Sequence, residues 1–153
     1  MTDQPELFHA TAVASAGGAA MIVGPSGAGK SALGLQLLAL GAELVADDCC
    51  ALERQGDDVL VSRPTDLPQM IEVRGFGLIP VPCCPPTPLR LIVDLEASFT
   101  SRLPETCTMN LLGCDVVVMT KIDGPHFSAA IMTYLASCSG KGRPVLSVVP
   151  DDK

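Results

Sequence analysis

The chain has 153 residues, about the size of one domain, and a formal net charge of −7. Hydrophobic residues make up 48% of it and charged residues 18%, a balance that excludes an intrinsically disordered chain. The negative charge and the 3% aromatic content argue against a nucleic-acid partner. We expect a single domain over residues 1–153, with many turns, because the chain contains 14 glycines and 13 prolines.

The seven cysteines include no CxxC pair, so we expect reduced thiols and no zinc site. The first six residues contain two acidic and no basic side chains, whereas a signal peptide starts with basic ones. The apolar stretch 10–23 is too short to span a bilayer. We therefore expect a cytoplasmic protein with no membrane partner.

Runs of small and β-branched residues predict strands, and apolar residues at helical spacing predict two helices. The expected strands are residues 7–13, 19–23, 43–46, 50–54, 59–63, 89–95, 106–111 and 115–120. The expected helices are 31–40, with Gly41 well placed at the C′ position, and 127–138. Residues 64–88 are predicted to be mostly loop with a short helix near 66–70, and 139–144 a polar loop. The predicted fold class is α/β, with a strand-rich sheet around a central phosphate-binding helix, as in P-loop kinases.

The strongest motif is the run Gly24-Pro25-Ser26-Gly27-Ala28-Gly29-Lys30-Ser31, which fits GxxxxGK[ST] between a predicted strand and a predicted helix. Its glycines let successive N–H groups point at phosphate oxygens, and the N-terminus of the helix adds positive partial charge. Lys30 can neutralise the β and γ phosphates, and the Ser31 hydroxyl is a suitable ligand for Mg²⁺. The motif predicts a nucleotide phosphate site without saying what reaction follows.

Several charged residues are candidates for the chemistry. Asp47 and Asp48 stand at the carboxyl end of a predicted strand, where ligands bind in α/β sheets, and either can accept a proton from a hydroxyl. A capping role in a turn explains this pair equally well. Glu72 can complete a metal shell and Arg74 can bind phosphate, or the two can form a surface ion pair. His9 lies in an apolar strand, which is typical of a packed core residue.

These segments together resemble the catalytic domain of HPr kinase/phosphorylase, a bacterial P-loop enzyme that acts on a serine of the phosphocarrier protein HPr. His9 precedes the P-loop by the family's distance, residues 44–48 read LVADD, and residues 71–79 (IEVRGFGLI) are similar to the family's EIRGLGI motif. Residues 101–104 stand where the family has a DRLG-like segment. The LVADD and EIRGLGI-like segments are specific to this family, whereas the P-loop is not.

The resemblance implies a role for each matching residue. Asp47 would deprotonate the serine of HPr, and would act as the acid in the reverse phosphorolysis, with His9 assisting at the phosphate. Lys30 would neutralise the transferring phosphoryl group, and Arg102 would stabilise charge during transfer. Such roles fit phosphoryl transfer, which depends mainly on positioning and electrostatics.

The resemblance also implies cofactors and partners. ATP would be the phosphate donor, Ser31 and Glu72 would hold Mg²⁺, HPr would be the protein substrate, and the protein would form homo-oligomers, often hexamers. Two features depart from the family. The 153 residues have no room for the usual extra N-terminal domain, as in the short forms of α-proteobacteria. The PVRPGRN loop, tied to dephosphorylation, is replaced by residues 118–125 (VMTKIDGP), in which Lys121 can restore part of the charge.

The sequence leaves other functions open. Residues 120–123 (TKID) resemble the guanine-reading [NT]KxD of small GTPases, but no Asp from 47 to 115 is followed by Gly three positions later, as a GTPase requires. Residues 91–94 (LIVD) resemble a Walker B strand, which suits a generic ATPase or a small-molecule kinase. A domain that binds nucleotide as a sensor, without transferring phosphate, is a third alternative.

Overall fold

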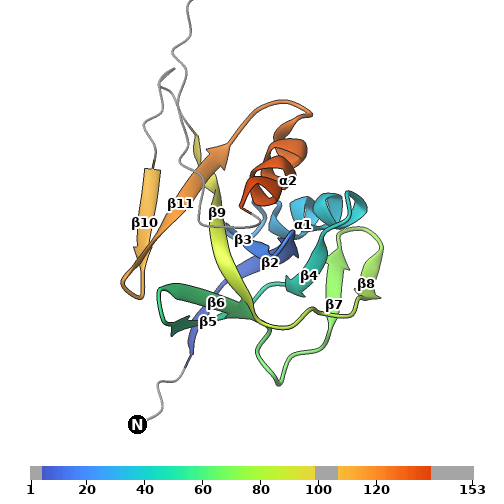
Figure 1. Ribbon diagram of the computed structural model, residues 1–153. Coiled ribbons are helices and arrows are strands. Elements are labelled where there is room, and N and C mark those ends of the chain that lie inside the picture. Colours follow the sequence, from blue (N-terminus) through green and yellow to red (C-terminus); the bar gives the residue numbers. More distant parts are fainter. Residues whose placement is uncertain (1–4, 99–106, 139–153) are drawn as a thin grey trace, which may run out of the picture.

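The computed structural model describes residues 5–98 and 107–138, which form a strand-rich α/β domain (Figure 1). Its main sheet has nine strands in the order β1-β5-β6-β9-β3-β2-β4, with β11 paired to β9 and β10 paired to β11. These strands are β1 (Glu6–Phe8), β2 (Ala10–Ser15), β3 (Gly18–Val23), β4 (Glu43–Ala46), β5 (Cys50–Gln55), β6 (Asp58–Ser62), β9 (Thr87–Ser98), β10 (Cys107–Leu111) and β11 (Cys114–Lys121). A second sheet pairs β7 (Met70–Val73) with β8 (Gly77–Pro80). The described helices are α1 (Lys30–Ala39) and α2 (Phe127–Ser137).

The centre of the main sheet brings several strand ends to one edge. β3, β9 and β11 run parallel, and Val23, Asp94 and Thr120 are aligned across them. β4 runs in the same direction, because β2 pairs antiparallel with both β3 and β4. β2 therefore starts at the edge where its neighbours end, with Ala10 opposite Val23. This topology brings residues near 9, 24, 47 and 121 together, as expected for a ligand site in an α/β sheet.

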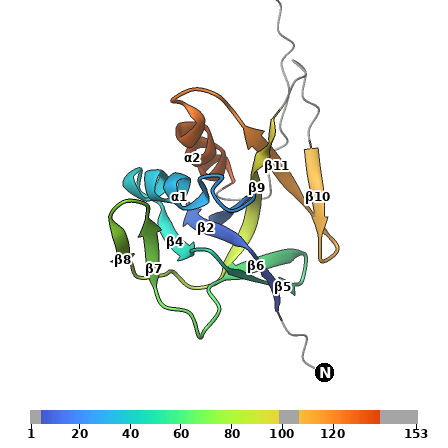
Figure 2. The same cartoon turned by 180° about the vertical axis from the view of Figure 1, so that it is seen from behind.

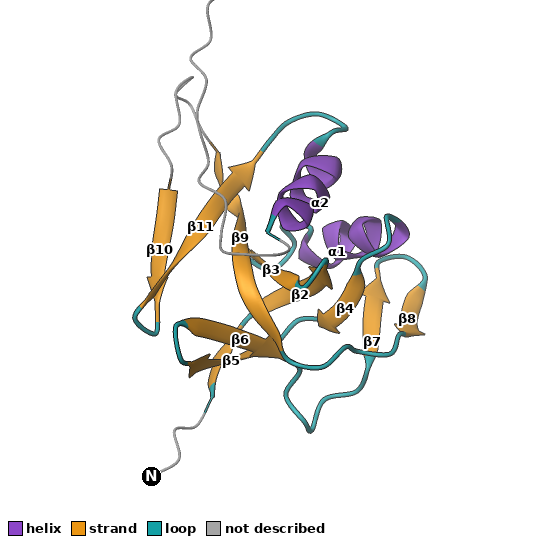
Figure 3. Cartoon of the chain, in the orientation of Figure 1, coloured by secondary structure: helices purple, strands orange, loops and turns teal. Residues whose placement is uncertain are grey.

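Both faces of the central strands are buried, which explains their nearly continuous apolar sequences. On one face, Ile22 of β3 and Val93 of β9 share a core with α1 and α2, which lie side by side there (Figure 3). On the other face, Met21 shares a core with residues of β5, β6, β10 and β11. Seen from behind, β10 and β11 lie at the opposite end of the molecule from β7 and β8 (Figure 2). Mixed α/β layers are thus confirmed.

The predicted end of the first helix is confirmed by its backbone geometry, and the turn between β2 and β3 has the geometry of a tight hairpin. Gly41 has φ +108° and closes α1 as a Schellman motif: its N–H donates to Leu38 O at 3.0 Å, and the N–H of Ala42 donates to Leu37 O at 3.0 Å. Ala16 and Gly17, both with positive φ, connect β2 to β3, a left-handed two-residue turn that suits the twist of a hairpin.

Three predictions about local structure are wrong. Residues 66–70 form no helix: Leu67 N–H bonds to Pro64 O in a turn, and β7 begins at Met70. The hairpin β7–β8 in the expected loop exists because Ile71, fully buried under α1, anchors it to the core. The single strand expected at 7–13 is two strands that pair with different partners, β1 with β5 and β2 with β3, so the chain changes direction at His9. The loop expected at 139–144 lies outside the described residues.

Candidate functional site

The P-loop, residues 24–31, connects β3 to α1 and holds its lysine close to its own backbone. Gly29 occupies the N-cap of α1 with φ +101°, a left-handed conformation that favours glycine. Lys30 is 7% exposed, and its Nζ donates to Gly24 O at 2.8 Å and to Pro25 O at 3.1 Å. An ammonium group has three donors, so one is left for a phosphate oxygen at the start of the helix.

Asp47, at the end of β4, is the centre of a hydrogen-bond network that joins four parts of the chain. Its Oδ1 accepts from Ser31 Oγ at 2.7 Å and from Thr11 Oγ1 at 2.8 Å, and its Oδ2 accepts from Glu72 N at 3.0 Å. The carboxylate thus ties the P-loop serine to β2 and β7. Sequence reasoning missed Thr11, which is fully buried; the signal was a hydroxyl among the apolar residues at the start of β2 (ATAVA).

Asp48 differs from its neighbour because its side chain turns toward solvent. Its Oδ1 lies 3.4 Å from Nδ1 of His9, and the side chains are 76% and 54% exposed, respectively. The alternative of a packed core histidine is therefore wrong. Asp48 has φ +72°, an uncommon backbone conformation for a residue other than glycine, and its N–H donates to Thr11 Oγ1 at 3.5 Å. Strained backbone of this kind gathers at functional sites.

A cavity of about 450 Å³ collects most of the residues that the sequence singled out. Its charged and hydroxyl-bearing lining residues are His9, Ser26, Lys30, Ser31, Asp48, Glu72 and Arg74. The residues just before β2 and just after β4, the end of β7, the P-loop and α1 contribute to it, although several of these segments are far apart in sequence. Of the two adjacent carboxylates, the one that lines the cavity is Asp48, whereas Asp47 is held by Ser31 and Thr11. Arg102 lies outside the described residues.

The residues predicted to hold Mg²⁺ are compatible with it. The Ser31 hydroxyl donates its proton to Asp47, so its oxygen lone pairs are left to act as ligands. Glu72 lines the same cavity and offers a second hard oxygen donor. Within the described part of the chain, no group of three His, Cys, Asp or Glu residues could hold a metal alone. Such a sparse set suits an ion that takes its other ligands from nucleotide phosphates and water.

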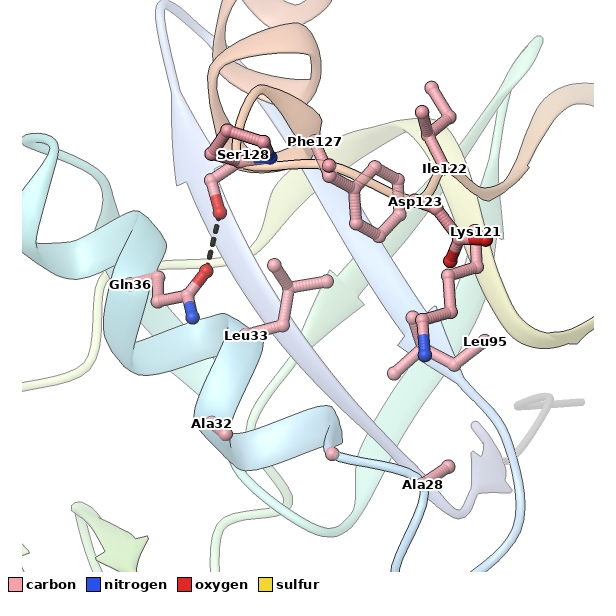
Figure 4. A pocket seen from close by; sticks show the side chains of 13 residues that line it. Ala28, Ala32, Leu33, Gln36, Leu95, Lys121, Ile122, Asp123, Phe127 and Ser128 are labelled. Atoms are coloured by element: carbon pink, nitrogen blue, oxygen red, sulfur yellow. Dashed lines mark hydrogen bonds between the residues drawn. The ribbon is translucent and has the colours of Figure 1, made fainter.

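A second cavity, of about 510 Å³, lies between α1 and the segment that leads from β11 into α2 (Figure 4). It shares Gly29, Ala32 and Gln36 with the first cavity, and residues 121–125, which begin at the last residue of β11, form its far wall. The resemblance to the family had assigned no role to this segment beyond a substitute charge at Lys121.

Within the described residues, neither helix is long and apolar enough to cross a membrane.

Comparison with known proteins matches residues 3–84 to the family model of the HPr Serine kinase C-terminal domain. The HPr kinase/phosphorylase of Prosthecochloris aestuarii is 32% identical over 126 residues, covering 74% of this chain and 37% of that protein. The Burkholderia lata protein of the same name is 35% identical over 126 residues, again covering 74% of this chain and 39% of the relative. The chain thus spans somewhat over a third of the length of these relatives.

The fold is also similar to a solved structure, that of the Hpr(Ser) kinase/phosphatase from Coxiella burnetii. The TM-score is 0.71, with 24% identity, and the match covers 84% of this chain and 87% of that chain. At this identity the likeness concerns the fold, and it agrees with the strand-rich α/β arrangement described above.

Proposed function

Because this chain belongs to the HPr Serine kinase C-terminal domain family, we propose that it is an ATP-dependent protein serine kinase that phosphorylates an HPr-type phosphocarrier protein in the cytoplasm. The observation that carries the proposal is the convergence on one cavity of a P-loop lysine and serine, a histidine–aspartate pair and Glu72. Phosphoryl transfer needs this combination: donors for phosphate, oxygen ligands for a metal ion and a carboxylate for a proton.

The positions of these groups support the following reaction. The serine oxygen of the acceptor attacks the γ-phosphorus, the bond between the γ-phosphorus and the β–γ bridging oxygen breaks, and ADP leaves. The N-terminus of α1 and the remaining donor of Lys30 bind the phosphate oxygens and stabilise the transferred charge. Arg74, which lines the cavity, adds a planar cation suited to phosphate oxygens. Mg²⁺, held by Ser31 and Glu72, would neutralise the charge on the β and γ phosphates.

The proton of the attacking hydroxyl goes to a carboxylate, and two candidates stand side by side. Asp47, predicted from the sequence, accepts three hydrogen bonds, which fix its position and occupy most of its acceptor sites. Asp48 lines the cavity beside His9 and is a second candidate for the same step. In that case Asp47 is a positioning residue that aims the Ser31 oxygen, and His9 stabilises the ionised Asp48.

Comparing Asp47→Asn with Asp48→Asn separates these roles. If Asp48 takes the proton, its variant loses transfer but binds nucleotide and Mg²⁺ normally, whereas Asp47→Asn weakens Mg²⁺-dependent nucleotide binding. If Asp47 takes the proton, Asp47→Asn abolishes transfer without a change in Mg²⁺ dependence, and Asp48→Asn transfers at near the normal rate.

The remaining parts of the proposal come from the resemblance. They are transition-state stabilisation by Arg102, assembly into homo-oligomers such as hexamers, and membership of the short α-proteobacterial type. Phosphorolysis of phosphorylated HPr is part of the proposal only in reduced form, because residues 118–125 stand in place of the PVRPGRN segment. The net charge of −7 supports a function without nucleic acid.

The test is incubation with γ-labelled ATP, Mg²⁺ and an HPr-type protein. Label on a serine of that protein supports the proposed function. Release of free phosphate with no labelled protein would instead identify an ATPase, and binding of ATP without turnover would identify a nucleotide sensor. Light scattering of the same preparation measures the oligomeric state.

A further inference from the structure

The TKID segment occupies a defined place relative to the P-loop. β3, which leads into the P-loop, is followed across the sheet by β9 and then β11, all parallel and in register at Val23, Asp94 and Thr120. Lys121, Ile122 and Asp123 therefore leave the sheet at the same edge as the P-loop, two strands away, and α2 begins shortly afterwards. The proposed phosphoryl transfer uses none of these residues.

The cavity between this segment and α1 has apolar walls and a charged end. Leu33, Leu95 and Phe127 supply the apolar walls, and the charged groups are Lys121 and Asp123 (Figure 4). The side away from the P-loop is closed by a hydrogen bond from Ser128 Oγ to Gln36 Oε1 at 2.6 Å, which joins α2 to α1. A cavity with apolar walls and polar groups at its ends is typical of a small-molecule site.

The direction of a bound nucleotide follows from the two cavities. Both include Gly29 and Ala32 at the start of α1, where phosphates bind, so the phosphate chain lies between them. The first cavity is lined by His9 and Asp48, the groups that the proposed function uses in transfer, so on that function it takes the γ-phosphate. The nucleoside then extends into the second cavity, whose volume of about 510 Å³ is ample for a purine base.

We propose that the second cavity is the nucleobase site and that Asp123 makes it prefer guanine, so that GTP serves as a donor beside ATP. This inference rests on the proposed function, because it places the phosphates at the P-loop. An ionised carboxylate only accepts hydrogen bonds. Guanine presents two neighbouring donors, N1–H and the N2 amino group, whereas adenine presents a lone pair at N1, which repels a carboxylate. The aliphatic part of Lys121 can cover one face of the base while its ammonium reaches toward the P-loop.

The test is direct binding to the full chain, measured by displacement of a fluorescent nucleotide, without acceptor protein. We expect GDP to bind about tenfold more tightly than ADP, equivalent to about 1.4 kcal/mol. Asp123→Asn should remove this preference and increase the affinity for XDP, because xanthine has a carbonyl at C2 that accepts from the amide nitrogen while its N1–H donates to the amide oxygen. Asp115→Asn, the same change on an exposed residue of β11 away from the cavity, is the control and should bind as the native protein does.

Each outcome is decisive. Equal or tighter binding of ADP, unchanged in Asp123→Asn, would overturn the guanine site and leave the proposed kinase function intact. Loss of guanine preference without gain of XDP binding would also contradict the direct pairing, because that pairing predicts that Asp123→Asn accepts xanthine as it loses guanine. Equal weakening of all nucleotides would show that the role of Asp123 is merely structural, and would likewise overturn the guanine site. Absence of binding by any nucleotide would overturn this inference and the proposed function together, whereas guanine-selective binding without transfer to HPr would overturn only the latter.

Discussion

Replacing Thr11 with valine tests whether the network around Asp47 is as important as its geometry indicates. Thr11 is fully buried, donates to Asp47 Oδ1 at 2.8 Å and accepts from Asp48 N at 3.5 Å. Valine has nearly the same shape, so the change removes these hydrogen bonds without opening a cavity. A hydrogen bond to a charged group contributes about 1.5–3 kcal/mol, and the new methyl returns part of this. We expect the free energy of unfolding to fall by about 2 kcal/mol.

Urea denaturation followed by circular dichroism measures this change as a lower midpoint with an unchanged slope. A loss of about 2 kcal/mol corresponds to roughly 6 °C in melting temperature for a chain of this size. Thr108→Val, the same substitution on an exposed position of β10, is the control and should change stability by less than about 0.5 kcal/mol. If Thr11→Val were as stable as this control, the position of Asp47 would not depend on Thr11. The hydrogen-bond network would then contribute little to the stability of the site.

Three further changes test the fold that holds the site. Gly41→Ala should lower stability by about 1–2 kcal/mol in thermal melting, because φ is +108° at this position and alanine is strained there; no change would contradict the Schellman geometry. Ile71→Ala should cost about 3 kcal/mol in urea denaturation because Ile71 is fully buried, whereas Leu78→Ala, on an exposed residue of the paired strand, should be nearly neutral; equal effects would show that β7 is not anchored by its apolar side chain. Burial raises the pKa of the Cys50 thiol above its ordinary value of 9.0, so the folded protein keeps a proton that the unfolded chain loses at higher pH. The free energy of unfolding should therefore fall as pH rises above about 9, by up to 1.4 kcal/mol per pH unit from this thiol, and a Cys50→Ala variant that falls as steeply would refute this cause.

Local signals were sufficient where a short stretch of sequence determines its own structure. The P-loop glycines, Gly41 at the end of α1 and the apolar runs of the central strands gave elements within a few residues of those observed. The hairpin β7–β8 could not be predicted in this way. Its prolines and glycines read as loop, and its stability comes from Ile71, which packs against α1 and the main sheet.

The sequence predicted which residues gather near the P-loop, but not how their side chains are arranged there. The sequence singled out His9, Asp47 and Glu72, and the fold brings all three near the P-loop, because β2 starts at the edge where β3 and β4 end. Of the two adjacent aspartates, Asp48 lines the cavity, and its positive φ directs it there. An aspartate in the sequence does not by itself predict this backbone conformation. The role of Thr11 depends on a contact with a residue 36 positions away, which no local pattern reveals.

The most direct test of the central claim is the mass of an HPr-type protein after incubation with ATP, Mg²⁺ and this protein. The native protein should add one phosphoryl group, located on a serine by fragmentation. Lys30→Ala should add none, because Lys30, whose Nζ donates to Gly24 O and Pro25 O, is the P-loop charge proposed to bind the phosphates. An unmodified acceptor with the native protein, or full modification with Lys30→Ala, would contradict the account.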